Sequence, residues 1–233
     1  MAEYVNGFLY GVYPYIALSV FFLGSLVRFD MDQYSWRSGS SQLLRRRQLV
    51  LGSNLFHVGI LVIFLGHFFG LLTPIALFHA FGIPNGFKQV MAMGAGGVAG
   101  VFCFIGLTML LHRRLADPRI RRTSSFWDIA ILVLLWIQLT LGMATILVSA
   151  QHLDGAEMVR FMEWANGVVT FRHDAAALML DAPLLFKVHI FLGLTIFLVA
   201  PFTRLVHVWS APVWYLGRKG YQIVRTLNHR TPA

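Results

Sequence analysis

Four histidines lie inside long apolar stretches of the sequence. His57 and His67 share one stretch, and His189 and His207 share another, much later in the chain. An ionisable side chain within a membrane-spanning segment costs free energy, so its presence there indicates a function. The neutral imidazole nitrogen is a good ligand for transition metals and for haem iron. Two apolar segments with two histidines each could therefore hold two metal centres.

The stretches that carry these histidines are two of five apolar segments that are long enough to cross a bilayer as helices. Lipid offers the backbone no hydrogen-bond partners, so runs of this length must be helical. The predicted helices cover about residues 8–27, 48–72, 88–111, 126–149 and 184–209. With 57% hydrophobic and only 12% charged residues, the composition is that of a membrane protein. We predict an all-α, polytopic membrane protein with a single domain over residues 1–233.

The basic residues predict the orientation of these helices. Only four of the 19 lysines and arginines, Lys88, Arg160, Arg172 and Lys187, fall on one side of the predicted membrane. Because Lys and Arg gather on the cytoplasmic side, the amino terminus is predicted outside and the tail, residues 210–233, in the cytoplasm. The net charge of +9 then reflects topology rather than nucleic-acid binding. An acidic soluble partner could also dock on the basic face.

The amino-terminal residues and the cysteine count argue against three features: a cleaved signal peptide, an internal disulfide and an iron–sulfur cluster. The opening residues, MAEYVNGF, place no basic residue before the first apolar run, so a cleaved signal peptide is not expected. Cys103 is the single cysteine, so this chain can form neither an internal disulfide nor a cysteine-ligated iron–sulfur cluster. Any such cluster would have to lie in another polypeptide.

The predicted topology pairs the histidines across the membrane. The second helix runs from inside to outside and the fifth runs back, so His67 faces His189 near the outer side and His57 faces His207 near the inner side. On a continuous fifth helix, His189 and His207 would be roughly 27 Å apart, against roughly 15 Å between His57 and His67. A kink at Pro201 is one way to remove that mismatch.

Haem suits these pairs better than a bare metal ion. Two imidazoles leave zinc or copper short of ligands, whereas a porphyrin supplies four nitrogens and needs only axial ligands. Gly52, Gly59 and Gly66 recur every seven residues on the second helix and form a stripe without side chains. A flat macrocycle could lie on this stripe, or the small residues could allow close helix packing. Packing is the expected role of the glycines of the third helix, Gly94, Gly96, Gly97 and Gly100.

Two basic residues close to the histidines have two interpretations each. Arg204, three residues before His207, could pair with a haem propionate, or its side chain could extend to the inner membrane interface. Lys187, two residues before His189, has the same two interpretations at the outer side.

Several longer runs resemble one known family. They are SNLFHVGILVIFLGHFFGLLTP (53–74), FKQVMAMGAGG (87–97), SAQHLDGAEM (149–158) and FKVHIFLGLTIFLVAPFTRLVHVWSAPVWYL (186–216). These runs closely resemble the gamma subunit of respiratory nitrate reductase, a dihaem b-type cytochrome of the cytoplasmic (inner) membrane, and the histidine spacings match. The resemblance covers nearly the whole chain.

The resemblance implies roles for individual residues. The four histidines would be the axial ligands of two b haems, in the pairs given above. Lys88 would lie at a quinol site beside the outer haem, where an ammonium could donate a hydrogen bond to a quinone oxygen. An interfacial lysine is the plainer interpretation of this residue. Gly66 and His67 would be near neighbours of the quinol ring.

The resemblance also implies a reaction. Ubiquinol or menaquinol would be oxidised at the outer side, and electrons would cross through both haems to an iron–sulfur beta subunit and a molybdenum-containing alpha subunit that reduces nitrate. The charge separation would contribute to a proton gradient. Two alternatives stay open: a dihaem quinol-oxidising subunit of a related sulfur-metabolism reductase, and a haem-free membrane anchor or small transporter.

Overall fold

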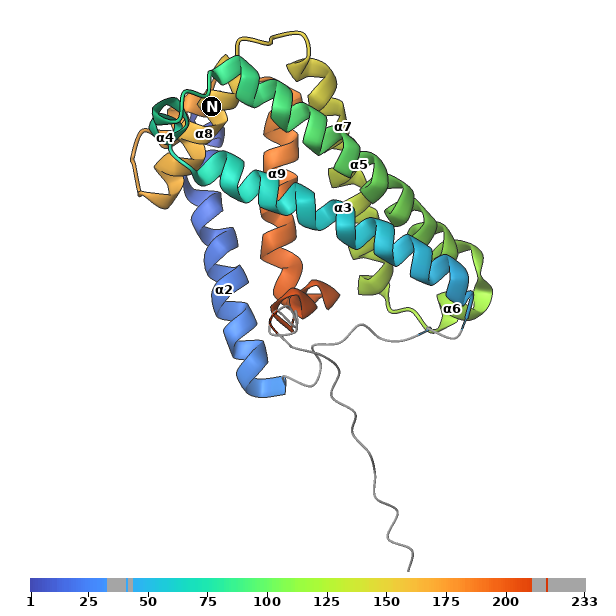
Figure 1. Ribbon diagram of the computed structural model, residues 1–233. Helices are drawn as coiled ribbons and strands as arrows, with labels where there is room; N and C mark the ends of the chain where they lie inside the picture. The colour runs from blue at the N-terminus through green and yellow to red at the C-terminus, as the bar shows by residue number, and fades with distance from the viewer. Residues whose placement is uncertain (33–40, 42–43, 211–216, 218–233) are drawn as a thin grey trace, which may run out of the picture.

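Five long helical segments build the molecule (Figure 1). The structure, a computed structural model, describes residues 1–32, 41, 44–210 and 217. Every regular element within these ranges is helical. The segments that are long and apolar enough to cross a membrane are Ala2–Asp32, Arg46–Leu72, Asn85–Ala116, Phe126–Ser149 and Leu184–Phe202. The all-α class and the five predicted spans are confirmed, whereas the predicted tail 210–233 lies outside the described residues apart from Ser210 and Gly217.

The first segment starts earlier than predicted and contains a π-helical turn. Its elements are α1 (Ala2–Gly7), the π-helix η1 (Phe8–Val12) and α2 (Tyr13–Asp32). Pro14 has no N–H to donate to the carbonyl of Tyr10, four residues earlier. The indole Nε1 of Trp164, in α8 (Ala156–Val169), donates to that carbonyl instead, at 2.9 Å. This hydrogen bond satisfies the freed acceptor and anchors the first segment to α8.

Close packing joins α3 (Arg46–Leu72) to α5 (Asn85–Ala116), the most extensive helix pair of the bundle. A glycine makes the approach possible. A Cβ at Gly59 would lie 2.6 Å from the carbonyl oxygen of Ala99 and 2.6 Å from the amide nitrogen of Cys103. The backbones of the two helices are therefore in direct contact at this point.

The glycines of the α3 stripe differ in what they face. Gly52 also packs on α5, whereas a Cβ at Gly66 would meet no atom of the described part of the chain within 4 Å. The predicted packing role of the α5 glycines finds no contact at Gly94 and Gly96, because no atom of the described residues lies within 4 Å of a Cβ at either position. It is right for Gly100, which lies against Met143 of the fourth span.

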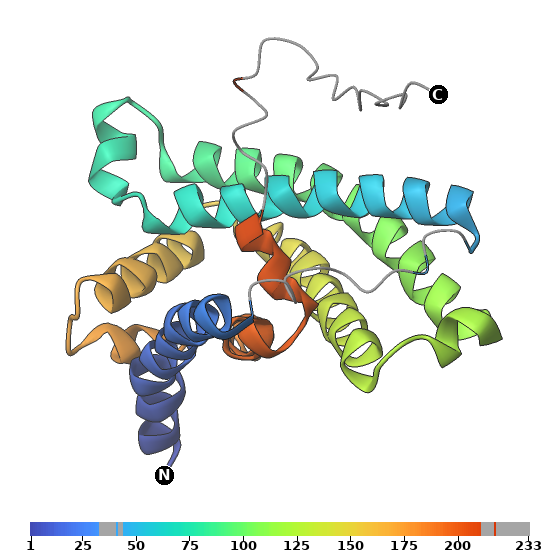
Figure 2. The ribbon, with the colours of Figure 1, turned by 90° about the horizontal axis from the view of Figure 1, so that it is seen from below.

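The fourth span, α7 (Phe126–Ser149), joins the two halves of the bundle. It packs on α5 on one side and on α9 (Leu184–Val199) on the other. α9 also packs on α2, and Figure 2 shows α9, in orange, between α2 and α7. The helix pair α3 and α5 is thus connected to α2 and α9 mainly through α7.

The fifth span is not one continuous helix, so the prediction for residues 184–209 is wrong in this respect. α9 ends at Val199. Two 3₁₀ segments follow, η4 (Ala200–Phe202) and η5 (Arg204–Ser210). Pro201 explains the break, because proline lacks an N–H and its ring clashes with the carbonyl four residues earlier.

The break changes where His207 lies. Thr203, between the two 3₁₀ segments, has an extended backbone, so the chain changes direction there. In Figure 2 the segment after α9 turns toward α3. His189 and His207 therefore do not share one helix face, and the axial mismatch expected for a continuous helix does not arise.

A buried apolar core caps the end of the bundle that carries the amino terminus (Figure 1). α8 and the 3₁₀ segment η3 (Ala175–Met179), neither of which the sequence predicted, supply most of it. Its buried residues are Tyr10, Phe161, Trp164, Ala165, Val168, Ala175, Met179 and Ala182. α8 packs across α3, so this cap fixes one end of the first and second helical segments relative to each other.

At the opposite end, Asp117 holds the short helix α6 (Pro118–Arg122) on the end of α5. The carboxylate accepts hydrogen bonds from the amides of Arg119 and Ile120 and pairs with Arg45 at 3.0 Å. Burial alone would raise the pKa of Asp117, but these hydrogen bonds and the positive charges of Arg119 and Arg45 hold the pKa below its ordinary value.

Candidate functional site

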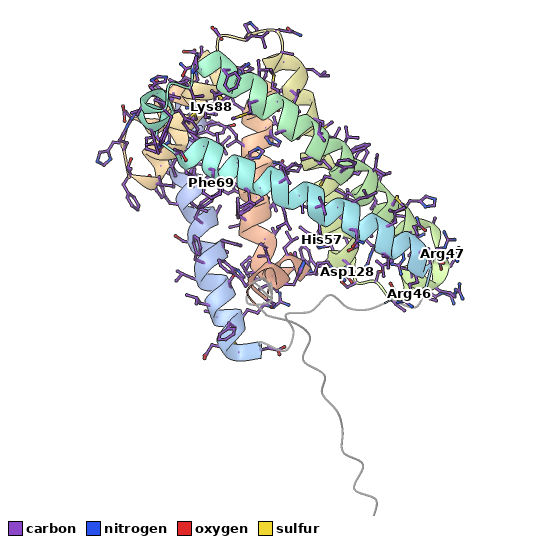
Figure 3. All side chains as sticks on the ribbon, in the orientation of Figure 1. Arg46, Arg47, His57, Phe69, Lys88 and Asp128 are labelled. Carbon is purple, nitrogen blue, oxygen red and sulfur yellow. The ribbon has the colours of Figure 1, made fainter. Side chains whose placement is uncertain are left out.

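The structure brings the four histidines together in two opposed pairs. The ring centroids of His67 and His189 are 6.3 Å apart, and those of His57 and His207 are 6.2 Å apart. α3 supplies one histidine to each pair, while α9 and η5 supply the others. These are the pairs that the predicted topology gave. Figure 3 labels one member, His57, toward the end of the bundle opposite to Lys88.

Backbone hydrogen bonds fix the tautomer of three of these rings. The Nδ1 atoms of His57 and His67 lie 2.7 and 2.8 Å from the carbonyl oxygen four residues earlier. The Nδ1 of His207 lies 2.5 Å from the carbonyl oxygen of Arg204. Because a carbonyl only accepts, each Nδ1 carries the proton and donates it. This tautomer leaves the lone pair of Nε2 available to a metal, and the hydrogen bond orients the ring.

His189 is supported by another helix instead. The side-chain nitrogen of Gln138, in α7, donates to the backbone oxygen of His189 at 3.1 Å. The Nδ1 of His189 is buried and has no hydrogen-bond partner among the described residues. A Cβ at Gly142, one turn along α7 from Gln138, would lie 2.9 Å from the Cε1 of His189. The imidazole therefore rests against α7 at a position that only glycine leaves open.

The spacing within each pair fits two axial ligands of one haem iron. A metal–imidazole bond is about 2 Å long and the ring centroid lies roughly 1 Å beyond the nitrogen, so two opposed ligand rings have centroids about 6 Å apart. Both observed separations match this value. No three His, Cys, Asp or Glu side chains gather as ligands in the part of the chain that the structure describes. The pairs thus suit a group that brings its own equatorial nitrogens.

The packing of the histidine-bearing helices also fits such a group. α3 buries only Gly52 and Gly59, and α9 buries no residue. α3 packs mainly on α5, whereas α9 packs mainly on α2 and α7. The faces that carry the histidines are therefore only partly covered by protein, which is what a flat macrocycle between them requires.

Lys88 is buried within the protein, since only 4% of it is exposed. Its Nζ donates to the carbonyl oxygen of Gly70 at 3.0 Å and to the sulfur of Met162 at 3.1 Å, and it lies 4.5 Å from the ring centroid of Phe78. Gly70 lies one turn after His67 on α3. The ammonium is thus close to the pair formed by His67 and His189, and within the described residues only one of its contacts is to an oxygen.

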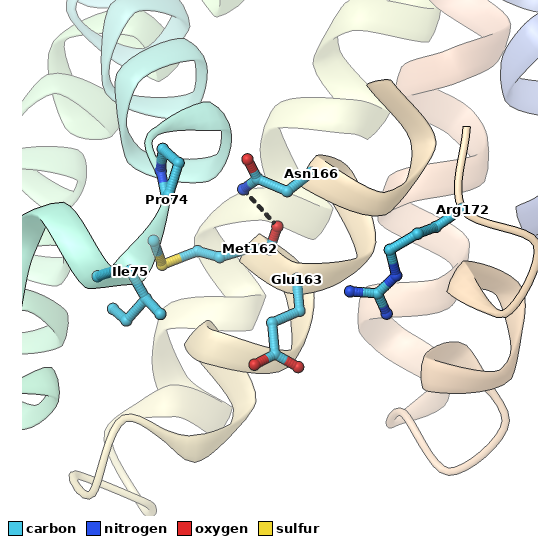
Figure 4. Close-up of a pocket in the computed structure, with 7 residues that line it drawn as sticks. Pro74, Ile75, Met162, Glu163, Asn166 and Arg172 are labelled. Carbon is cyan, nitrogen blue, oxygen red and sulfur yellow. Dashed lines mark hydrogen bonds between the residues drawn. The ribbon is translucent and has the colours of Figure 1, made fainter. Parts of the chain in front are cut away.

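Figure 4 shows a pocket of about 280 Å³ beside α8. Its wall includes Met162, whose sulfur accepts from Lys88. The other lining residues are Pro74, Ile75, Ala76, Glu163, Asn166 and Arg172. The side chain of Asn166 donates to the backbone oxygen of Met162 at 2.8 Å.

Arg204 belongs to a cluster of charges near the His57 end. Its Nε pairs with Asp128 at 2.9 Å, and Arg114 lies 3.6 Å from the same carboxylate. Asp128 also completes the capping box of α7 with Ser125. Figure 3 labels Asp128 on the same end of the bundle as His57. Arg204 therefore contacts a protein carboxylate, a partner that the sequence did not suggest.

Sequence reasoning missed the supporting residues of α7, namely Asp128, Gln138 and Gly142. A signal existed for one of them, because Gln138 is an amide in the middle of an apolar span and such polar residues mark interhelical contacts. Gly142 carries no such signal, since its importance depends on the ring that it faces.

The fold and these residues define a class: a multi-pass membrane protein with two opposed histidine pairs, one toward each end of its helical bundle. The nitrate reductase gamma subunit family matches residues 6–227, and the chain belongs to this family. This confirms the resemblance noted in the sequence. It also confirms the predicted location as a multi-pass protein of the cytoplasmic membrane. A gamma subunit is one part of an oxidoreductase with several subunits.

Two relatives cover almost the whole chain. The respiratory nitrate reductase 1 gamma chain of Escherichia coli is 52% identical over 223 residues, which is 96% of this chain and 98% of the relative. The nitrate reductase gamma chain of Bacillus subtilis is 41% identical over 210 residues, 90% of this chain and 94% of the relative.

Proposed function

We propose that this chain is the membrane cytochrome b subunit that oxidises quinol for a nitrate reductase. The observation that carries the proposal is the presence of two histidine pairs with centroids 6.3 and 6.2 Å apart, the separation that bis-histidine haem ligation requires. Family membership supports nitrate reductase over a sulfur-metabolism reductase.

His67 and His189 are the proposed ligands of an outer b haem, and His57 and His207 those of an inner one. When bound, a b haem supplies one-electron transfer. The protein holds the rings: carbonyl acceptors set the tautomer of three of them, and α7 supports the fourth. Arg204 is proposed to lie close enough to the inner haem to pair with a propionate as well as with Asp128.

Lys88 is the proposed quinol-binding residue. Its buried ammonium can donate a hydrogen bond to a quinol oxygen and stabilise the negative charge left when the quinol loses a proton. Gly66 is proposed to border the ring, because among the residues that the structure describes no atom lies within 4 Å of a Cβ there. Ubiquinol and menaquinol present the same pair of ring oxygens, so both fit this role.

The proposed orientation places the amino terminus and the quinol site outside and the carboxyl-terminal tail in the cytoplasm. Electrons then leave at the cytoplasmic face for an iron–sulfur beta subunit and a molybdenum-containing alpha subunit, and the charge separation contributes to a proton gradient. The whole chain, residues 1–233, acts as one membrane-embedded domain.

A reduced-minus-oxidised optical spectrum of the purified chain, with a pyridine haemochrome assay, tests the proposal. Two b haems per polypeptide are expected. One haem would mean that one pair does not bind haem, and His57→Ala and His67→Ala would show which. No haem in protein made with an adequate haem supply would overturn the proposal and leave a haem-free membrane anchor.

A further inference from the structure

The break after α9 leaves backbone carbonyls that need hydrogen-bond donors. Residues around a helix end lose their regular partners, and Pro201 and Thr203 are buried, so water does not replace them. Arg28, on α2, supplies donors at this point. Its Nη1 donates to the carbonyl oxygen of Pro201 at 2.6 Å and to that of Thr203 at 3.0 Å. One guanidinium nitrogen thus bridges both sides of the break.

Two further residues of α2 hold the same segment. A Cβ at Gly24 would lie 3.1 Å from the Cβ of Pro201, so α2 and the break are in close contact. The buried hydroxyl of Ser25 accepts a hydrogen bond from the indole nitrogen of Trp209 at 3.2 Å. α2 therefore contacts the segment at its beginning and at its end.

His207 lies between these fixed points. The segment is also ordered internally, because the Oγ1 of Thr203 donates to the carbonyl of Ala200 at 3.1 Å and accepts from the amide of Leu205 at 3.3 Å. With both ends held by α2 and the interior hydrogen-bonded, the position of His207 depends on how Arg28 holds the backbone after the break at Pro201.

We infer that Arg28 is a positioning residue that holds the break after α9 so that His207 faces His57. On an unbroken helix, His207 would lie roughly 27 Å from His189, against roughly 15 Å between the two histidines of α3. Arg28 stabilises the redirected backbone that removes this mismatch. The inference rests on the proposed haem ligation, and it assigns to Arg28 the inner pair and not the outer one.

Arginine suits this task for a geometric reason. Its guanidinium is planar and always charged, with several donors in a fixed arrangement. Lysine keeps the charge and can still donate to one or both carbonyls, whereas glutamine has a shorter side chain with no charge. Arg28→Lys should therefore weaken the hydrogen bonds to the carbonyls of Pro201 and Thr203, and Arg28→Gln should remove them.

The test uses the full chain purified in detergent, with the haem count and an optical redox titration. Arg28→Gln is expected to lower the haem content from two to about one per polypeptide. The spectrum of the remaining haem should match that of His57→Ala and not that of His67→Ala. Arg28→Lys should restore the second haem with a shifted midpoint potential. Arg46→Gln, which removes an exposed arginine at the start of α3, should keep both haems.

Two results would overturn the inference. One is an Arg28→Gln protein with two haems and the titration curve of the wild type. The other is an equal loss of both haems. If the wild-type chain holds no haem, hydrogen–deuterium exchange of residues 200–209 still decides, since exchange should rise severalfold in Arg28→Gln and not in Arg46→Gln. Unchanged exchange would refute the positioning role of Arg28 independently of the proposed function.

Discussion

Gly59→Ala tests the contact that positions two of the four histidines. A Cβ at this position would lie 2.6 Å from backbone atoms of both Ala99 and Cys103, whereas ordinary contacts begin at 3.4 Å. Neither of these backbone atoms can rotate away, so α3 and α5 have to separate locally by about 0.8 Å to accept the methyl group. His57 lies half a turn from this point on the same helix and has to move with it.

The size of the effect follows from the same geometry. Forcing one extra methyl group into a close-packed contact costs about 1–3 kcal/mol. For a chain of this length, each kcal/mol lowers the melting temperature by about 2–4 °C, so the expected decrease is about 2–12 °C. Metal–ligand distances tolerate changes of only about 0.2 Å, so a shift of α3 should also lower the haem content.

Thermal unfolding followed by far-ultraviolet circular dichroism in detergent, together with the haem count, measures both effects. Gly96→Ala is the matched control, because the same methyl group on α5 would meet no atom within 4 Å in the ranges that the structure describes. This control should keep the melting temperature or raise it slightly, since alanine favours the helix. If Gly59→Ala and Gly96→Ala have the same melting temperature and both retain two haems, the reasoning about helix contact is wrong.

Other perturbations act on single groups. Lys88→Ala removes a charged hydrogen bond of about 1.5–3 kcal/mol and should slow quinol oxidation by about 10–150-fold while both haems stay; loss of either haem spectrum would contradict the assigned role. Gly142→Ala places a methyl group 2.9 Å from the ring of His189, so the variant should lose the outer haem and resemble His67→Ala in its spectrum, and an unchanged spectrum would count against that contact. Because the folded pKa of Asp117 is lowered, its stabilising contribution is complete above the unfolded pKa and disappears as the pH falls through the folded one. Asp117→Asn should therefore reduce the decrease in melting temperature between about pH 5 and pH 2, and identical pH profiles for the variant and the wild type would refute this.

Hydropathy and charge predicted much of the architecture. Each of the five spans is a long apolar run, and a polypeptide in lipid has few alternatives to a helix. The histidine pairs were predictable for a related reason, because an ionisable side chain stands out in an apolar run and antiparallel helices bring equivalent levels together. The predicted pairs, His67 with His189 and His57 with His207, are the neighbours in the structure.

The break after α9 and the helix α8 were harder to predict from the sequence. Pro201 marks a possible kink, but proline alone does not say whether the helix bends or ends. The outcome depends on Arg28, which is 173 residues away in sequence from Pro201. α8 lies in a segment that is too polar to be a span, and the contacts that define its role are those with the first and second helical segments.

The supporting residues show why ligands are easier to predict than what holds them. A ligand such as a histidine interrupts the apolar pattern of its own segment. A residue that positions a ligand fits the pattern of its segment and acts through a contact with a residue far away in sequence. Arg28 is the clearest case, since in the sequence it is one positive charge among many on the predicted cytoplasmic side, and the predicted topology alone explains it. In the structure the same guanidinium also binds two carbonyls at the break before His207. The topology depends only on the positive charge of Arg28, whereas the hydrogen bonds to Pro201 and Thr203 depend on the geometry of its guanidinium. The substitution Arg28→Lys keeps the charge and changes the geometry, so it separates the two roles.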